Sequence, residues 1–424
     1  MGYAPKPTSE ALLKGVPWED NMRKTISLLF GLALSQLVAA QSPGVYGDRI
    51  VVGGVLDLEG QSRGLGLNMR DGVLAAFEGV SIKGRRLEYV TLNDSYTPDL
   101  TVEQINRLIR DGVFAMIGNV GTPTAQVALP ILADNKVPAV GFFTGAGLLR
   151  PGVGDVINFR ASYVQETAKV IEQGFRAGLQ ASEICAYVQN DAYGMAGVEG
   201  IKLALQNNVR SRDIVEKLDT ILAKSGDSPE RNGIGPVGVY QRNTLTSRAG
   251  FESLKEWEKA SNSRCRLVVT VGTYNAIGRF AAYSKQRGED WLISAVSFTG
   301  AENLRDTLDR FGVTDKVILT QVVPDLESDL PIVKEARSAL GERLNVVSLE
   351  GYIVGKMFVA IMQSIKGDLT RESFVRATRN AEFNIGGVAL DFRGDNQGSD
   401  LVTMTYFNNK SYLPIEGSQL ARLF

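Results

Sequence analysis

The segment Arg49-Ile-Val-Val-Gly-Gly-Val-Leu-Asp-Leu58 is the strongest indication of the fold. A near-continuous apolar run of this kind is typical of a strand that is covered on both faces of a sheet. A Gly-rich loop follows it, and a helical pattern then places apolar side chains on one face at Met69, Val73, Ala76 and Phe77. A buried strand that leads directly into such a helix is the first half of a βαβ unit. It predicts an α/β protein with a parallel sheet.

The same alternation continues after Phe77. Short apolar runs predict further strands at Leu87–Leu92, Val113–Gly118, Pro138–Phe143 and Val156–Arg160. One helix is predicted between the first and second of these strands. Another, over Thr124–Asn135, is predicted between the second and third. The pattern is interrupted at Leu148–Asp155, which is rich in Gly and Pro. These features predict one α/β unit that ends near Arg160.

A second α/β unit follows the first. Its predicted helices are Val164–Ala177, Met195–Asn207, Phe251–Ala260 and Ala276–Gln286. Its predicted strands are Ile184–Gln189, Val237–Tyr240, Leu267–Val271 and Trp291–Val296. The segment Arg212–Pro236 is long and polar, and we expect a surface insertion there.

The remaining chain predicts a strand, three helices and a closing pair of strands. In order, these are Val317–Val322, Leu330–Leu340, Ser348–Ile365, Arg371–Asn380, and Val388–Phe392 paired with Leu401–Phe407. Beyond the leader described next, no stretch is expected to reach the length of a transmembrane helix.

The segment Met22–Ala40 has the three parts of a secretory signal peptide. A short basic start precedes the apolar run Ile26–Leu34, and small residues precede Gln41. The alternative is a buried helix of the mature fold. Because the polar residues 1–21 do not fit in front of a signal, we expect an upstream extension there, a true start at Met22 and a mature chain that begins near Gln41.

Composition narrows the function classes. The chain has 424 residues, 44% of them hydrophobic and 22% charged, which is ordinary for a soluble globular protein of two or three domains. The net charge of −1 gives no indication of nucleic-acid binding. The sequence contains no His, which excludes Ser-His-Asp and Cys-His catalysis and His-ligated zinc. Since no tight carboxylate or Lys constellation replaces them, we expect neither an enzyme nor a cofactor.

The two cysteines, Cys185 and Cys265, leave two alternatives open. Each lies in or beside a predicted strand, and strands that neighbour each other in a sheet are close enough for a disulfide. Export would favour that bond. The alternative is two buried free thiols that pack as small apolar groups.

Ligands of open parallel sheets bind beyond the carboxyl ends of the strands, so the segments after the strands are informative. The loop Glu59–Gly66 is Gly-rich but lacks both the dinucleotide pattern and the Lys-Ser/Thr of a phosphate loop. Hydroxyls and a helix start at Asn119–Thr124 suit a carboxylate, although Thr122 could equally be an ordinary N-cap. Further segments of this kind are Phe142–Gly145, Asn190–Gly194, Gly272–Tyr274 and Ser297–Gly300.

With these segments the chain resembles the type I periplasmic binding proteins of the leucine/isoleucine/valine-binding family, over about residues 48–414. Members of that family supply ABC importers of branched-chain amino acids and amides. The resemblance rests on Arg49–Leu56, Asn93–Pro98, Ile117–Thr124, Pro138–Thr144, Asn158–Arg160, Asp191–Gly194 and Glu350–Tyr352. It implies two Rossmann-like lobes, each a parallel sheet flanked by helices, joined by three crossovers. The implied lobes are 48–160 with about 325–382, and 161–324 with about 383–414.

The resemblance also implies a ligand site between the lobes. It places a ligand carboxylate on Asn119–Thr124 and Thr144, a closing side chain at Tyr274, and an acidic partner for an ammonium in the loop that matches Ser297–Gly300. Here that loop has Thr299, so Asp191 or Glu59 would substitute, or the ligand lacks a cation. We expect the ligand to contact Asn119, Thr122, Phe143, Thr144, Ser162, Tyr163, Asp191, Tyr193, Tyr274 and Thr299.

The expected function is therefore that of a periplasmic, non-catalytic and monomeric receptor. Its lobes would close over an amino acid, amide or short carboxylate and present it to ABC permease subunits in the inner membrane. Two alternatives remain: a sensory module that docks on a signalling receptor, and a secreted α/β enzyme.

Overall fold

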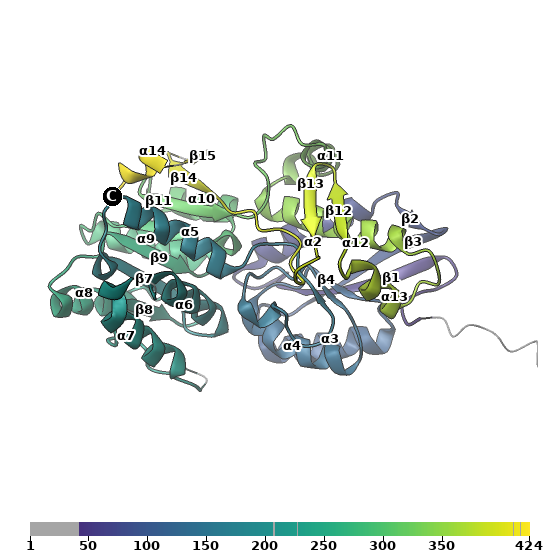
Figure 1. Cartoon of the computed structure of the whole chain (residues 1–424), viewed down its shortest axis with the longest axis horizontal. Coiled ribbons are helices and arrows are strands. Elements are labelled where there is room, and N and C mark those ends of the chain that lie inside the picture. The colour runs from purple at the N-terminus through teal and green to yellow at the C-terminus, as the bar shows by residue number, and fades with distance from the viewer. Residues whose placement is uncertain (1–41, 207, 227, 410, 416) are drawn as a thin grey trace, which may run out of the picture. The chain divides into compact units, whose positions relative to one another are not determined.

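The computed structural model describes residues 42–424 apart from 207, 227, 410 and 416. The expected export segment 22–40 and the expected upstream extension 1–21 lie outside the described residues. The described chain forms two large β-sheets, each flanked by helices, which confirms the predicted α/β class (Figure 1).

The first sheet has the strand order β2-β3-β1-β4-β5-β6. Its strands are β1 (Arg49–Leu56), β2 (Ser81–Ile82), β3 (Arg85–Asn93), β4 (Met116–Ile117), β5 (Ala139–Val140) and β6 (Val156–Ile157). All neighbouring strands are parallel except β2 and β3. Because β1 is buried along almost its whole length between β3 and β4, the apolar run at Arg49 forms the centre of a parallel sheet.

Helices from two separate parts of the chain pack around this sheet. The early ones are α2 (Arg63–Phe77), α3 (Pro98–Asp111) and α4 (Thr122–Asp134); the late ones are α11 (Pro331–Leu340), α12 (Val346–Ser364) and α13 (Arg371–Thr378). In Figure 1 the late helices, in green and yellow-green, lie with the purple and blue elements. We call this sheet and its six helices the first lobe.

The second sheet has the order β15-β14-β11-β10-β9-β7-β8. Its strands are β7 (Ile184–Gln189), β8 (Val237–Tyr240), β9 (Leu267–Val271), β10 (Leu292–Ala295), β11 (Val317–Gln321), β14 (Thr403–Asn408) and β15 (Ser411–Pro414). Five are parallel, while β14 and β15 add an antiparallel edge. The helices here are α5 (Tyr163–Arg176), α6 (Ala192–Leu205), α7 (Arg212–Ala223), α8 (Arg248–Ser261), α9 (Tyr274–Gln286), α10 (Ala301–Arg310) and α14 (Gly417–Ala421). Sheet and helices form the second lobe.

Short 3₁₀ turns complete the secondary structure. They are η1 (Gly147–Leu149), η2 (Ala181–Glu183), η3 (Val209–Ser211), η4 (Ser297–Thr299) and η5 (Gly341–Arg343).

The expectation of a surface insertion at Arg212–Pro236 is wrong for its first half. That half is helix α7, which buries Ile214, Leu218 and Ile221. These residues follow the i, i+4, i+7 spacing of an amphipathic helix, a signal that the polar remainder of the segment obscured.

The predicted pairing of Val388–Phe392 with Leu401–Phe407 is also wrong. Strand β13 (Val388–Asp391) instead pairs with β12 (Glu382–Ile385), and this hairpin contacts α12. Strand β14 lies antiparallel to β11 in the second sheet. The chain was expected to return to the second lobe at about residue 383. It returns only at β14, because residues 392–402 carry it from the first lobe to the second.

Helix α12 corrects the expectation that no later stretch reaches membrane-spanning length. It is long and apolar enough to cross a bilayer by length and composition alone. Most of it is buried, however, largely against α2. Its apolar character is explained by its place as a core helix of the first lobe.

Cys185 and Cys265 form a disulfide, so the first of the two alternatives applies. The bond joins the start of β7 to the residues that precede β9, its parallel neighbour. It therefore lies at the amino ends of the strands.

The chain passes between the lobes three times, at 158–162, 322–330 and 392–402. The first and third passages lie side by side, since Gly398 N–H donates to Asn158 O and Ser399 N–H donates to Phe159 O, each at 2.9 Å. The passages place the carboxyl ends of both sheets near each other.

Candidate functional site

The carboxyl ends of the strands bring polar side chains together in the first lobe. Thr122 opens α4 and Thr144 follows β5, and their hydroxyl oxygens lie 2.7 Å apart. Gly121, the N-cap of α4, has a φ of 106°, and a Cβ there would lie 2.3 Å from the Tyr96 ring. A glycine is therefore required where the helix start approaches the ring. None of the described side chains caps this helix start.

Two other buried polar groups, on segments that follow strands of the first sheet, have no hydrogen-bond partner among the described residues. Asn119 accepts a bond from Val55 N–H through Oδ1, but its Nδ2 is unpaired. The Tyr163 hydroxyl is likewise unpaired. Burial raises the pKa of Tyr163 to about 12, against the opposing effects of Arg160 and of the nearby Thr144 hydroxyl. Unpaired buried donors are costly, so they mark a place where another molecule can bind.

Aromatic rings from both lobes lie next to this polar group. Phe298, in η4 of the second lobe, has its ring centroid 5.0 Å from that of Phe143 and 6.5 Å from that of Tyr96, both in the first lobe. Tyr193 lies in the first turn of α6. Its ring centroid is 4.7 Å from that of Phe298 and 5.4 Å from that of Tyr163. All five side chains are buried, so the region between the lobes is aromatic.

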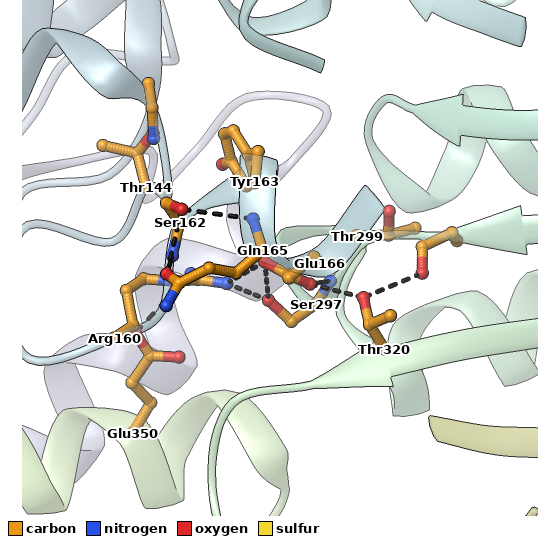
Figure 2. A network of polar contacts seen from close by, with 12 residues as sticks. Thr144, Arg160, Ser162, Tyr163, Gln165, Glu166, Ser297, Thr299, Thr320 and Glu350 are labelled. Atoms are coloured by element: carbon orange, nitrogen blue, oxygen red, sulfur yellow. Dashed lines mark hydrogen bonds and ion pairs between the residues drawn. The ribbon is translucent and has the colours of Figure 1, made fainter. Parts of the chain in front are cut away.

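A buried ionic network joins the lobes beside the rings (Figure 2). Arg160, in the first passage, lies 3.5 Å from Glu166 of α5 and 3.5 Å from Glu350 of α12. Glu166 also accepts bonds from the backbone N–H of Ser297 at 2.7 Å and from the Thr320 hydroxyl. One cation is therefore shared between a carboxylate of the second lobe and one of the first.

Burial sets the protonation of this network. It raises the pKa of Glu350 to about 7, against the opposing charge of Arg160, and Glu166 adds to the rise. Glu350 and Glu166 keep the pKa of Arg160 above its ordinary value in spite of desolvation. Arg160 thus stays charged, while Glu350 takes up a proton near neutrality.

Several predicted site residues serve local structure. Ser162 caps α5 by accepting from Gln165 N–H at 3.2 Å, and Thr299 donates its hydroxyl to Gly272 O at 2.9 Å. Asp191 caps α6 and is bound by Gln189 at 2.8 Å and Arg242 at 3.3 Å. Burial raises the pKa of Asp191, and Arg242 opposes this rise.

Glu59, the other acid expected to substitute, and the nearby Glu302 also accept hydrogen bonds. Glu59 accepts a bond from Asn93 at 3.2 Å, and Glu302 lies in α10, where it accepts from the N–H of Val346 at the start of α12. No group of three or more acidic or cysteine side chains in the described part of the chain is placed to hold a metal ion.

The lobes also meet at the rim of the site, around Gln61. Its carbonyl oxygen accepts from the Tyr274 hydroxyl at 3.0 Å and from the Asn275 side chain at 2.8 Å, while its own amide donates to Asn243 O at 2.9 Å. Nearby, Asn68 and Asn303 are 3.4 Å apart. These bonds hold the first lobe's loop after β1 against the second lobe.

Of the ten predicted residues, the structure places Asn119, Thr122, Phe143, Thr144, Tyr163 and Tyr193 in the polar and aromatic cluster. Tyr274 lies at the rim, and Ser162, Asp191 and Thr299 act as caps or local bonds. The residues that the prediction missed are Tyr96, Phe298, Arg160, Glu166 and Gln61. Arg160 stood in the sequence as a lone cation at the end of an apolar strand, which was the available signal for it.

Known proteins resemble the chain in both sequence and structure. The family described as "Periplasmic binding protein" matches residues 49–214. A possible leucine/isoleucine/valine-binding protein from Rhodopirellula baltica SH 1 is 33% identical, with 87% of this chain and 96% of that chain covered and a TM-score of 0.75. None of the curated proteins matches the chain.

More distant structures share the fold. A solute binding protein of an ABC transporter from R. palustris, solved in complex with 4-hydroxybenzoate, is 15% identical, with 87% of this chain and 96% of that chain covered and a TM-score of 0.68. A leucine binding protein from Thermotoga maritima MSB8 is 16% identical, with 86% and 97% covered and a TM-score of 0.63.

Proposed function

Since the chain belongs to the type I periplasmic binding proteins of the leucine/isoleucine/valine-binding family, we propose that it is the periplasmic solute receptor of an ABC importer. Its two lobes close over a small solute, and the closed form presents that solute to permease subunits in the inner membrane. The single observation that carries the proposal is the cluster of buried donors at Asn119, Thr144 and Tyr163, two of them unpaired, at the meeting of the lobes.

The placement of the cluster supports closure as the functional motion. The aromatic contacts between Phe298 and Phe143 and the hydrogen bonds of Gln61 exist only while the lobes meet. A solute that binds both lobes would favour this closed arrangement over an open one. The relatives differ in the solutes their names record, so the family leaves the solute open among amino acids, amides and short carboxylates.

A thermal-shift screen tests the proposal. The mature chain would be heated with each amino acid, its amide and a set of small carboxylates. A solute at 100 times its Kd stabilises the native state by about 2.7 kcal/mol and raises Tm measurably. A panel with no stabilising compound would count against the proposal.

The site itself is tested by Thr144→Ala. The loss of the hydroxyl should weaken solute binding by about tenfold, because a buried donor to the solute disappears. The control is Thr378→Ala: Thr378 is also buried, but its hydroxyl donates only to Phe374 O at 3.1 Å within α13. Equal affinity in both variants would refute the site.

A further inference from the structure

We propose that the protein has a second ligand site, outside the cluster between the lobes, which binds a small organic cation: a primary ammonium on a short apolar body. The site is a cavity of about 430 Å³ where the second passage between the lobes meets the edge of the second sheet. Its volume is within the range of small-molecule sites, roughly 300–1,000 Å³. The proposal does not depend on the receptor function, because none of the described residues of the polar and aromatic cluster lines this cavity.

The walls of the cavity come from three parts of the chain. Helix α10 and the edge strands β14 and β15 form the side that belongs to the second lobe, with Glu302, Arg305 and Tyr412 among their residues. The passage at 322–330 forms another side, and Val346, the first residue of α12, belongs to the first lobe. Glu302 accepts a hydrogen bond from Val346 N–H at 3.3 Å, so the lobes touch at this wall. A ligand in the cavity would therefore contact both lobes and the chain that joins them.

The charges around the cavity are mostly negative. Among the described residues that line it, Glu302, Asp325 and Glu327 carry carboxylates, whereas only Arg305 carries a positive charge. The guanidinium of Arg305 is already held by Asp306 at 2.9 Å. Within the described chain neither Glu302 nor Asp325 forms an ion pair. A cation that enters this cavity therefore has counter-charges available to it.

The Glu302 carboxylate is the lining group that a cation would stabilise most. Desolvation raises the pKa of Glu302, against the opposing effects of its hydrogen bond from Val346 and of the charge of Arg305. A bound ammonium would favour the ionised carboxylate and would offset part of this desolvation. Asp325 and Glu327 are exposed, and water weakens their attraction for a cation. Glu302 is thus the expected main partner of the ammonium.

The Tyr412 hydroxyl is a second, independent indication of a ligand. Its oxygen is buried, yet it has no hydrogen-bond partner among the described residues. Burial raises the pKa of Tyr412 well above its ordinary value, and the charge of Glu302 adds to this rise, so the hydroxyl stays protonated. A hydroxyl oxygen can accept hydrogen bonds, and a primary ammonium has three N–H groups to donate. One ammonium can therefore satisfy Glu302 and Tyr412 together.

The rest of the lining is apolar and determines the kind of cation. Val323 and Met404 are buried, and Leu326 and Val346 are partly buried against the core. Each methylene group of a ligand that is buried against such side chains binds favourably, whereas a hydrated metal ion gains nothing from them. In the described part of the chain, no group of three or more acidic or cysteine side chains is placed to hold a metal ion. The cavity therefore suits an organic cation.

Calorimetric titration of the mature chain with pentylammonium tests the site. The matched probes are 1-pentanol, which keeps the apolar body without the charge, and ethylammonium, which keeps the charge on a shorter body. Pentylammonium should bind at least about tenfold more tightly than either, since each probe loses one of the two kinds of contact. Equal or tighter binding of 1-pentanol or ethylammonium would overturn the proposal, and so would the absence of saturable binding of pentylammonium.

Variants of the lining residues assign the binding to this cavity. Tyr412→Phe keeps the ring and should weaken pentylammonium binding by about three- to tenfold, with no loss of stability in the free protein, because the hydroxyl bonds to none of the described residues. Tyr406→Phe, on the neighbouring strand β14, is the matched control: its hydroxyl accepts from Lys316 N–H, and it does not line the cavity. Glu302→Gln should remove the preference for pentylammonium over 1-pentanol.

The results for the two ligand sites can be told apart. If Thr144→Ala weakens the binding of pentylammonium and Tyr412→Phe does not, the amine binds between the lobes. That result would overturn the second site and leave the receptor function intact. Wild-type affinity for pentylammonium in both Tyr412→Phe and Glu302→Gln would overturn the second site as well.

Discussion

At the scale of single residues, the ion network around Arg160 connects the two lobes electrostatically. Its carboxylates come from α5 and α12, far apart in the sequence, and both are almost fully buried. Removing one partner of such a network leaves a buried charge without compensation, which is costly. Burial raises the pKa of Glu350 to about 7.

This shift gives a pH dependence with a definite sign. A carboxyl group whose pKa is higher in the folded than in the unfolded protein binds its proton more tightly in the folded state. Its contribution to stability is therefore lost as pH rises from the ordinary value of 4.5 through about 7. The free energy of unfolding of the wild type should fall as pH rises over this range. In Glu350→Gln we expect this fall to be smaller, by on the order of 1–3 kcal/mol.

Urea unfolding of wild type and variant between pH 4.5 and 8 measures the effect. The buried carboxyl of Asp94, whose pKa desolvation raises to about 6, contributes to the slope in both proteins, so only the difference is informative. Glu342→Gln, at an exposed residue of η5, serves as the control. If the free energy of unfolding depended on pH in the same way in wild type and Glu350→Gln, the contribution assigned to Glu350 would be contradicted.

At the scale of elements, the packing of α2 on α12 depends on glycine. A Cβ at Gly72 would lie 2.1 Å from Ser348 O and 2.6 Å from Tyr352 N, both backbone atoms that cannot move aside alone. At Gly174 in α5, the nearest atom would be a Leu267 side-chain carbon at 3.4 Å. The same substitution should therefore have opposite effects in two helices.

We expect Gly72→Ala to destabilise the protein by about 2 kcal/mol or more through overpacking, and Gly174→Ala to be neutral or to stabilise it by up to about 1 kcal/mol. Urea denaturation of the two variants measures both. Equal stabilities would show that the contact between α2 and α12 is looser than described.

The disulfide stabilises the second sheet at its amino edge. It links residues 80 apart, and its removal by Cys185→Ser with Cys265→Ser should cost about 2–4 kcal/mol. Because the site lies at the opposite ends of the strands, solute affinity should change little. A reductant should lower the Tm of wild type but not that of the double variant; an equal response would contradict the role of the bond.

At the scale of the whole molecule, the proposed receptor function depends on the balance between open and closed lobes. Tyr274 lies at the rim and donates to Gln61 O across the lobes. Tyr274→Phe keeps the ring and removes this bond, which exists only in the closed form. We expect solute affinity to fall about two- to tenfold, while the stability of the solute-free protein stays within about 0.5 kcal/mol of wild type.

Titration calorimetry and small-angle scattering measure affinity and closure together. Tyr283→Phe is the control on the same helix, since its hydroxyl accepts only from Arg287 at the surface. An affinity loss shared by both variants would show that the rim bond does not favour closure.

Local sequence patterns alone predict the α/β class, the buried centre of the first sheet, and the segments at the carboxyl ends of its strands. These follow from local periodicity and from the rule that ligands approach those ends. Six of the predicted site residues lie together for this reason. The periodicity of α7 is also present in Ile214, Leu218 and Ile221, but the polar composition of the surrounding segment obscures it.

How distant segments meet depends on tertiary packing and could not be predicted from local sequence. The separation of β13 from β14, the sharing of Arg160 between Glu166 and Glu350, and the insertion of Phe298 among first-lobe rings all join residues far apart in the chain. Local sequence specifies which face of an element is apolar, but not which of several similar faces it will pack against.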